Sequence, residues 1–347
     1  MSMRVLRKLS LLGIVACAAM AQPAIAQPAA SGPHPLIGIA DENLDMFSDP
    51  RFLQLGIRQV RFYMSWDVLS SVYKSHYRRN TLNSWLDDAR ALGLTPLITI
   101  DHSDLGRRQA ERLPSVTQYS RAFLAFRKRY PWVTEFATWN EANYYGEATA
   151  PHPKRVAQYY LALRRDCPRC TILAAELLDI DNPKQAVPML KWVRAFIHYA
   201  HTQPAYWGLH NYVSANKLSA VSTEQLLAVV KGDVWLTETG GILRFPHHGN
   251  PGFAMTDAHQ AKVVNFLLNT LPSVSPRIQR IYLYEWRAPV KRTAWDSSLI
   301  TYNNRPRAAF EVLASTLENW GIPPNCASLT FPPPCTSTTG TTGTTTP

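Results

Sequence analysis

Short apolar segments alternate with longer amphipathic segments along residues 35–320. Nearly continuous apolar runs of a few residues are typical of parallel strands that are buried on both faces of a sheet. The sequence therefore predicts eight strands, at residues 36–40, 59–64, 95–101, 135–139, 171–176, 206–210, 234–237 and 280–286.

The longer segments between these strands repeat apolar residues at helical spacing. They predict helices at residues 82–92, 116–129, 154–165, 189–199, 223–230, 257–271 and 307–320. The first link between strands is the weakest, because only residues 50–55 are available for a helix there. Strands that alternate with helices in this way indicate an α/β protein whose single domain is a (β/α)8 TIM barrel.

An open, doubly wound sheet is the alternative arrangement of the same elements. That fold usually has a glycine-rich phosphate-binding turn after its first strand. Here the first predicted strand is followed by Asp41, Glu42 and Asn43. The closed barrel is therefore favoured.

The N-terminal residues differ from this repeat. Residues 1–26 have a positively charged start, an apolar stretch and the small-residue site Ala24-Ile25-Ala26, which is the pattern of a cleaved signal peptide. A short linker, residues 27–34, follows. We expect a secreted, periplasmic or cell-wall-associated protein. The alternative is a lipoprotein, because Ile14-Val15-Ala16-Cys17 resembles a lipobox in which Cys17 is lipidated.

The C-terminal residues also differ in composition. Residues 321–335 hold five prolines and two cysteines, and residues 336–347 consist almost entirely of threonine and glycine. The last stretch cannot bury enough apolar surface to fold. The sequence therefore predicts a Pro/Cys-rich extension followed by a disordered tail.

The chain is strongly basic. Removal of the leader, which carries three basic residues and no acidic one, lowers the formal net charge from +11 to +8. This charge suits attraction to an anionic polysaccharide or wall surface, and a generally basic enzyme is the plainer interpretation. The sequence has no basic stripe with interleaved aromatic residues, so nucleic-acid binding is disfavoured. No apolar run after the leader is long enough for a transmembrane helix.

Four cysteines remain after cleavage of the leader: Cys167, Cys170, Cys326 and Cys335. In a secreted chain they indicate disulfides, and four cysteines allow three pairings. Local bridges, Cys167 with Cys170 and Cys326 with Cys335, are favoured because short loops close at a low entropic cost. A crossed pairing beneath the barrel stays open. No second Cys or His pair at metal spacing accompanies Cys167 and Cys170, so no metal site is expected there.

Polar and aromatic side chains follow the carboxyl ends of several predicted strands, which is where TIM barrels place their active sites. Two glutamates at separate strand ends could supply the pair of carboxyl groups that glycosidic bond cleavage requires. These residues are Arg61 on the second strand, Asn140 and Glu141 after the fourth, His210 and Tyr212 at the sixth, Glu238 after the seventh and Trp286 at the eighth.

This set resembles the retaining β-glycosidases of clan A, the 4/7 superfamily of glycoside hydrolases. The resemblance covers residues 35–320 and rests on Trp139-Asn140-Glu141 and on Thr237-Glu238-Thr239-Gly240. It implies that Glu141 is the general acid/base and Glu238 the nucleophile. Many members have proline after the acid/base, whereas this chain has Ala142, which affects loop shape more than chemistry.

The resemblance also implies roles for the neighbouring residues. Arg61 and a hydrogen bond from Tyr212 would keep Glu238 ionised, and Asn140 would hold the substrate 2-hydroxyl. His210 would make a polar contact beside the nucleophile. Trp286 would offer a flat face to a sugar ring, in which case Glu285 would point to the helical shell. Trp66 is a further candidate for stacking on a sugar, and Glu176 could be a substrate-side residue.

The sequence thus favours a secreted, monomeric glycoside hydrolase that acts on an oligo- or polysaccharide without a cofactor or a metal ion. A carbohydrate-binding barrel that has lost its activity is the second hypothesis. It would be expected to lack one of the glutamates or a partner of the nucleophile, and all are present. A lyase or isomerase barrel would need a phosphate or metal site, which the sequence does not show. The sugar, the linkage and endo or exo action are not determined by the sequence.

Overall fold

The structure is a computed structural model that describes residues 34–73, 76–180, 182–246 and 251–324. The predicted leader, the lipobox Cys17, the Cys326–Cys335 bridge and the Thr/Gly tail lie outside these residues.

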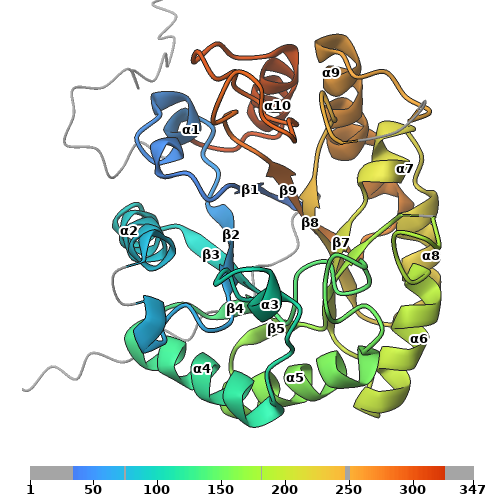
Figure 1. Cartoon of the computed structure of the whole chain (residues 1–347). Coiled ribbons are helices and arrows are strands. Elements are labelled where there is room, and N and C mark those ends of the chain that lie inside the picture. The colour runs from blue at the N-terminus through green and yellow to red at the C-terminus, as the bar shows by residue number, and fades with distance from the viewer. Residues whose placement is uncertain (1–33, 74–75, 181, 247–250, 325–347) are drawn as a thin grey trace, which may run out of the picture. The chain divides into compact units, whose positions relative to one another are not determined.

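Parallel strands form a nearly closed barrel at the centre of the described residues, surrounded by helices (Figure 1). The strand order is β5-β4-β3-β2-β1-β9-β8-β7-β6, so the first and last strands along the chain, β1 and β9, are neighbours. The bounds are β1 Leu36–Ala40, β2 Gln59–Ser65, β3 Thr95–Asp101, β4 Glu135–Ala137, β5 Thr171–Leu173, β6 Glu176–Leu178, β7 Tyr206–His210, β8 Asp233–Thr239 and β9 Ile278–Tyr284.

The fifth barrel strand is divided into two short pieces, β5 and β6. The break falls at Ala174 and Ala175, and these residues still join the barrel through hydrogen bonds to the next strand. The Ala174 amide donates to the Tyr206 carbonyl at 2.9 Å, and the Gly208 amide donates to the Ala175 carbonyl at 2.9 Å. The predicted TIM-barrel fold is confirmed, and the predicted strand 171–176 is the segment whose conformation differs most from the expectation.

Helices connect the strands and cover the outside of the barrel. The α-helices are α1 Pro50–Gln54, α2 Tyr77–Ala91, α3 Arg107–Ala110, α4 Val116–Arg129, α5 Pro153–Asp166, α6 Met189–Ala200, α7 Tyr212–Asn216, α8 Val221–Val229, α9 Asp257–Asn265 and α10 Ala308–Asn319. Short 3-10 turns are η1 Leu44–Met46, η2 Ser71–Tyr73 and η4 Leu271–Val274, and η3 Phe266–Thr270 is a π-helix.

Helix boundaries follow local capping chemistry. Helix α4 has its predicted bounds because Ser115 and Gln118 form a reciprocal capping box at its start. Helix α1 forms although it is short, since the Asp49 side chain accepts from the Arg51 amide at 3.0 Å and Pro50 occupies the first turn. The helix predicted at residues 257–271 instead changes to a π-helix after Asn265 and ends near Pro272, which cannot donate a helical hydrogen bond.

Two apolar layers hold the fold together. The larger layer lies between the sheet and the helices and contains the fully buried Trp85, Phe126 and Trp207. The smaller one fills the barrel interior with Ala40, Leu97, Ala137, Leu173, Trp235 and Tyr282. Because this interior is packed with side chains, a substrate can reach only the end of the barrel.

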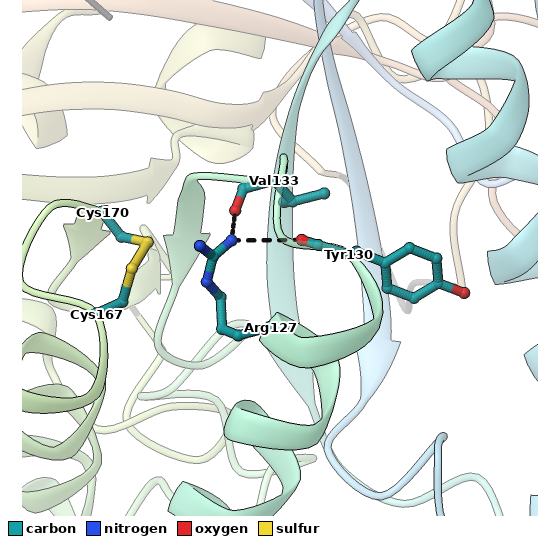
Figure 2. Close-up of a disulfide and its surroundings, with 5 residues drawn as sticks. All are labelled: Arg127, Tyr130, Val133, Cys167 and Cys170. Carbon is teal, nitrogen blue, oxygen red and sulfur yellow. Dashed lines mark hydrogen bonds between the residues drawn. A yellow bond between two sulfur atoms is a disulfide. The ribbon is translucent and has the colours of Figure 1, made fainter. Parts of the chain in front are cut away.

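Cys167 and Cys170 form a disulfide in the loop between α5 and β5, which is the local pairing favoured from the sequence. Figure 2 shows this bridge beside Arg127 of α4. The Arg127 guanidinium donates to the carbonyl oxygens of Tyr130 and Val133 and so holds the turn between α4 and β4. Both loops lie at the end of the barrel where helices lead back into strands, away from the strand ends that carry the candidate site.

Among the described residues, none of the helices combines the length and the apolar composition that crossing a membrane would require.

Candidate active site

Arg61 lies at the centre of a polar cluster at the carboxyl end of the barrel. Its side chain is completely buried, and its guanidinium contacts residues from five other strands or strand ends. Nε and Nη2 donate to the two carboxylate oxygens of Glu176 at 3.0 and 2.6 Å. Nε also donates to Thr99 Oγ1 at 3.1 Å, and Nη2 donates to Asn140 Oδ1 at 2.9 Å. A buried guanidinium with this many fixed contacts orients the groups around it.

Glu238 lies near the end of β8, where the pairing with β7 and β9 is interrupted by register shifts. Its Oε2 accepts from Arg61 Nη1 at 2.9 Å, and its Oε1 accepts from the Tyr212 hydroxyl at 3.1 Å. Both contacts were expected from the sequence. The side chain is 13% exposed, so it remains accessible from the cleft.

Glu141 is held by a loop with an unusual backbone. Its φ angle is +40°, a region that residues other than glycine rarely occupy. The loop is fixed on both sides of this residue, because the Asn140 amide donates to the Ile100 carbonyl at 3.0 Å and the Ala142 amide donates to the Glu176 carbonyl at 2.9 Å. Such strained positions persist only where the surroundings determine them, and they cluster at functional sites.

Glu141, His210 and Glu238 converge on one point of the cleft. One carboxylate oxygen of each glutamate and a His210 ring nitrogen all lie within 4.8 Å of one another. His210 Nδ1 is 3.1 Å from Glu141 Oε1 and 3.9 Å from Glu238 Oε2. The two glutamates that the sequence singled out are therefore brought together, from the ends of the fourth and seventh barrel strands.

The environment of Glu141 favours its protonated form. Burial raises the pKa of this carboxyl group, and the negative charges of Glu238 and Asp101 raise it further. The hydrogen bond and the charge of His210 act in the opposite direction but do not cancel the increase. The side chain is 22% exposed, so the proton can be exchanged with a bound ligand or with water.

His210 is a buried cation between acidic groups. Burial alone would lower its pKa, but the charge of Glu238 and hydrogen bonds with Glu141 and Glu176 together raise the pKa of His210 to about 9. For Glu176, burial and neighbouring charges act on the pKa in the opposite directions. Burial would raise its pKa, whereas the charge of Arg61, followed by His210, lowers the pKa of Glu176 to about 2. At neutral pH, Glu176 is therefore the permanent counter-ion that keeps Arg61 and His210 in place.

Arg61 contacts Glu238 and His210 lies beside it, which are the positions expected from the sequence. Both side chains are completely buried. They lie beneath Glu141 and Glu238 and position these two carboxyl groups. Asn140 is different, because its Nδ2 group has no hydrogen-bond partner among the described residues while its Oδ1 is held by Arg61. That free donor is available to a ligand hydroxyl.

Trp286 does not lie in the cleft. Strand β9 ends at Tyr284, two residues before the predicted end, and the Trp286 ring is fully buried between Phe52 and Phe310 of the helical layer. Its indole nitrogen donates to Asp49 Oδ2 at 3.2 Å. The prediction that Trp286 offers a face to a sugar is therefore wrong.

Trp295, and not Trp286, lies next to a residue that contacts Glu238. Its ring lies edge-on to Tyr212, with centroids 4.8 Å apart, and Tyr212 in turn donates to Glu238. The Trp295 indole donates to Ser297 Oγ at 2.9 Å, which fixes the ring at the rim of the site. Trp66, another predicted platform, is half-buried against the core, and its indole nitrogen is covered. A role of Trp66 in sugar binding stays a prediction.

Two buried carboxyl groups, Asp41 and Glu285, follow the first and last strands of the barrel. Asp41 follows β1, and its carboxylate accepts from the backbone amides of Asn43, Trp286 and Arg287, so it joins the ends of β1 and β9. Glu285 follows β9 and is 5% exposed, and its side chain makes no hydrogen bond to another described residue. Burial and the charges of neighbouring acids, including Asp41 and Glu238, raise the pKa of Glu285 to about 9. Glu285 was expected to face the helical shell if Trp286 lined the cleft, and Trp286 is itself packed in the helical layer.

A second group of charged residues lies beside Asn140. His102 Nδ1 is 3.1 Å from Asp101 Oδ1 and 2.9 Å from Glu147 Oε1, and the Trp139 indole donates to Glu147 Oε2 at 3.0 Å. The hydrogen bonds with Asp101 and Glu147 raise the pKa of His102 to about 11. In this trio, and in Glu141, His210 and Glu238, the possible ligand atoms lie within 4.8 Å of one another, and an ion could bind at either only after the histidine nitrogen had lost its proton.

Comparisons with known proteins agree with the fold. No family model matches the sequence, and no curated protein matches it. Among solved structures, the chain is similar to a family 39 glycoside hydrolase from Bacteroides cellulosilyticus WH2, with a TM-score of 0.55 and 14% identity over 82% of this chain and 64% of that one. This chain thus spans somewhat less than two thirds of the length of that enzyme.

Two xylanases are also similar. A mutant of xylanase 10C from Cellvibrio japonicus, solved with xylopentaose, has a TM-score of 0.60 and 15% identity over 83% of this chain and 68% of its own. Xylanase 10B from Thermotoga maritima has a TM-score of 0.59 and 13% identity over 83% of this chain and 96% of its own. At this identity the likeness concerns the fold alone, which is a TIM barrel.

Proposed function

We propose that the barrel is a retaining β-glycosidase in which Glu141 is the general acid/base and Glu238 the nucleophile. The observation that carries this proposal is the geometry of the pair, with carboxylate oxygens within 4.8 Å of one another. Retaining enzymes hold their two carboxyl groups about 5 to 5.5 Å apart, whereas inverting enzymes need about 6.5 to 9.5 Å to admit a water molecule.

The two glutamates also have the different environments that the two roles require. Glu238 accepts hydrogen bonds from Arg61 and Tyr212 and is therefore suited to attack as a carboxylate. Burial raises the pKa of Glu141, which suits it to the role of proton donor. In this assignment Arg61, His210 and Glu176 position the pair and do not touch the sugar.

The reaction would proceed in two displacements. In the first, a Glu238 oxygen attacks the anomeric carbon while Glu141 donates its proton to the departing glycosidic oxygen, which leaves a glycosyl ester on Glu238. In the second, the Glu141 carboxylate takes a proton from water, whose oxygen attacks the anomeric carbon and releases Glu238. The Nδ2 donor of Asn140 would bond the 2-hydroxyl, a contact that strengthens as positive charge develops on the sugar.

The acids around the cleft do not exclude a charged substrate. Burial and the charges of neighbouring acids raise the pKa values of Glu42 and Glu285, and a protonated carboxyl group does not repel an anion. We therefore propose an oligo- or polysaccharide substrate that is either neutral or anionic. Secretion and a monomeric state remain part of the proposal.

The test is a hydrolysis screen of neutral and uronic-acid aryl β-glycosides and of bacterial and plant polysaccharides. The Glu238→Gln variant is the blank, because it preserves the shape of the site and removes the nucleophile. We expect release of the aryl group from at least one of these glycosides by the native protein and no release by the variant. Equal rates from the two proteins would contradict the assignment.

A further inference from the structure

One side of the barrel carries an excess of positive charge that no catalytic step uses. Residues 116–202 contain twelve Lys and Arg and seven Asp and Glu. The structure describes six of these acids, and all six are buried or half-buried. The cations of the same segment mostly lie at the surface.

Exposed cations on the helices α4, α5 and α6, with one in the disulfide loop, form what we term the basic face. These helices pack side by side and make one continuous arc of the outer layer (Figure 1). The members of the basic face are Arg121, Lys128, Arg129, Lys154, Arg164, Arg165, Arg169, Lys191 and Arg194. With adjacent helix axes about 8 to 10 Å apart, the face is roughly 20 Å across.

Five of these cations have no hydrogen bond, ion pair or ring contact within the described residues, namely Arg121, Lys128, Arg169, Lys191 and Arg194. Among the other members, Arg165 pairs with Asp166 and Lys154 lies over the ring of Tyr199. Exposed cations without partners are free to pair with a ligand at no cost to existing contacts.

The other sides of the barrel are different. Helices α2, α8, α9 and α10 each carry exposed acids, which are Asp87 and Asp88, Glu224, Asp257, and Glu311 and Glu318. The arc of α4, α5 and α6 therefore differs from these four helices in carrying exposed cations without exposed acids.

We propose that the basic face is a docking surface for an anionic polysaccharide. A patch this wide, with guanidinium and ammonium groups on three helices, matches an extended chain with repeated carboxylate, phosphate or sulfate groups better than a single anion. The choice of a polysaccharide rests on the proposed glycosidase function, because such an enzyme meets glycans at its surface. The face would hold a charged glycan, and the cleft would cleave a glycosidic bond in it.

A membrane and a nucleic acid fit the basic face less well. The apolar sides of α4, α5 and α6 are buried against the barrel, and only Leu124, Leu161 and Tyr199 are exposed as large apolar side chains on these helices. That is too little apolar surface to insert into a bilayer. Single-stranded nucleic acids are usually held by several stacking aromatic rings, and the face exposes one.

The experiment compares two variants with equal charge change. The face variant replaces four unpartnered cations by glutamine, with Arg121→Gln, Lys128→Gln, Lys191→Gln and Arg194→Gln. The control variant carries Arg112→Gln, Lys231→Gln, Lys262→Gln and Arg305→Gln, which are exposed cations elsewhere on the chain. Binding is measured at low and high salt to four probes. These are polygalacturonate, an uncharged dextran, vesicles of phosphatidylcholine and phosphatidylserine in equal parts, and duplex DNA.

We expect the native protein and the control variant to bind polygalacturonate at low salt, and high salt to weaken this binding. The face variant should bind it about tenfold or more weakly, since several exposed ion pairs are lost together. An equal loss in the control variant would overturn the proposal, because net charge alone would then explain the binding. Tighter binding to the vesicles or to DNA would overturn it as well.

The same measurement separates this proposal from the proposed function. The Glu238→Gln protein should bind polygalacturonate as the native protein does, since binding at the face needs no turnover. The face variant should hydrolyse a small aryl glycoside at the native rate. If the native protein binds polygalacturonate through the face but cleaves no glycoside, the glycosidase assignment fails and the docking surface stands.

Discussion

The Arg61 guanidinium joins Glu238 to Glu176, with Nη1 2.9 Å from Glu238 Oε2 and Nη2 2.6 Å from Glu176 Oε2. Glu176 and Arg61 are completely buried, whereas Glu238 is partly exposed. Arg61 and Glu176 thus hold Glu238 in position at the cleft. The position of Glu238 therefore depends on a buried ion pair and not only on the end of its own strand.

Removal of this cation should affect both stability and activity. Arg61→Met leaves the Glu176 charge buried without a partner, and breaking such a pair costs about 3 to 5 kcal/mol. A matched control is Arg280→Met, which breaks the ion pair with Glu135 deep in the barrel, away from the cleft. Chemical denaturation should show both variants destabilised. Glycoside hydrolysis, measured where each variant is folded, should be lost only in Arg61→Met, and retained activity there would contradict the role given to Arg61.

His210 should set the alkaline side of the pH profile. A cation next to a carboxyl group lowers its pKa, and His210 has this effect on Glu141. His210→Asn removes the cation, so the pKa of Glu141 should rise further and Glu141 should keep its proton to higher pH. The alkaline limb of kcat/KM should therefore move to higher pH, with a lower maximum rate. The exposed His198→Asn is the control. A limb that stays in place or moves to lower pH would contradict this account.

Glu285 should make the protein less stable as pH rises. Its folded pKa, raised to about 9, lies above the usual value of 4.5, so the folded state binds a proton that the unfolded state releases. Stability from this group is present below about pH 4.5 and is lost as pH rises to about 9. Glu285→Gln cannot ionise, so its unfolding temperature should exceed that of the native protein by a margin that grows between pH 5 and pH 9. A constant margin would show that Glu285 is ionised in the folded state.

Trp295 and Trp286 should behave differently when truncated. Trp295→Ala removes a ring at the rim and should raise KM for a glycoside about tenfold or less while stability changes little, as expected for loss of one stacked ring. Trp286→Ala removes a ring packed between Phe52 and Phe310 and should lower the free energy of unfolding by about 3 to 5 kcal/mol. Kinetics and denaturation of both variants check this, and a KM effect confined to Trp286→Ala would reverse the assignment.

The sequence predicted the barrel and the central pair because both depend on local patterns. Strands β1, β3 and β7 and helix α4 have their predicted bounds, and Glu141 and Glu238 follow the strands that were expected. Trp286 was misplaced because apolar periodicity does not mark the residue at which strand pairing stops. Because β9 ends at Tyr284, the alternation of side chains along a strand does not predict which of Glu285 and Trp286 faces the cleft.

Other parts of the site depend on contacts that the sequence does not encode locally. Glu176 enters the barrel because the fifth strand is divided, a break that its apolar composition did not signal. His102 meets Glu147 through two loops from different strands. Asp41 and Glu285 are neighbours only because the barrel brings its first and last strands together. Contacts between strands that lie far apart in the sequence leave no pattern in the spacing of apolar residues.

The central claim is that Glu238 forms a covalent bond with the sugar while Glu141 transfers the proton. The most direct test is to incubate the protein with 2-deoxy-2-fluoro β-glycosides of the sugar identified in the hydrolysis screen and to analyse the intact and digested protein by mass spectrometry. We expect one glycosyl group per chain, attached to the peptide that contains Glu238. Turnover of the parent glycoside with no covalent adduct, or an adduct on another carboxylate, would contradict the account.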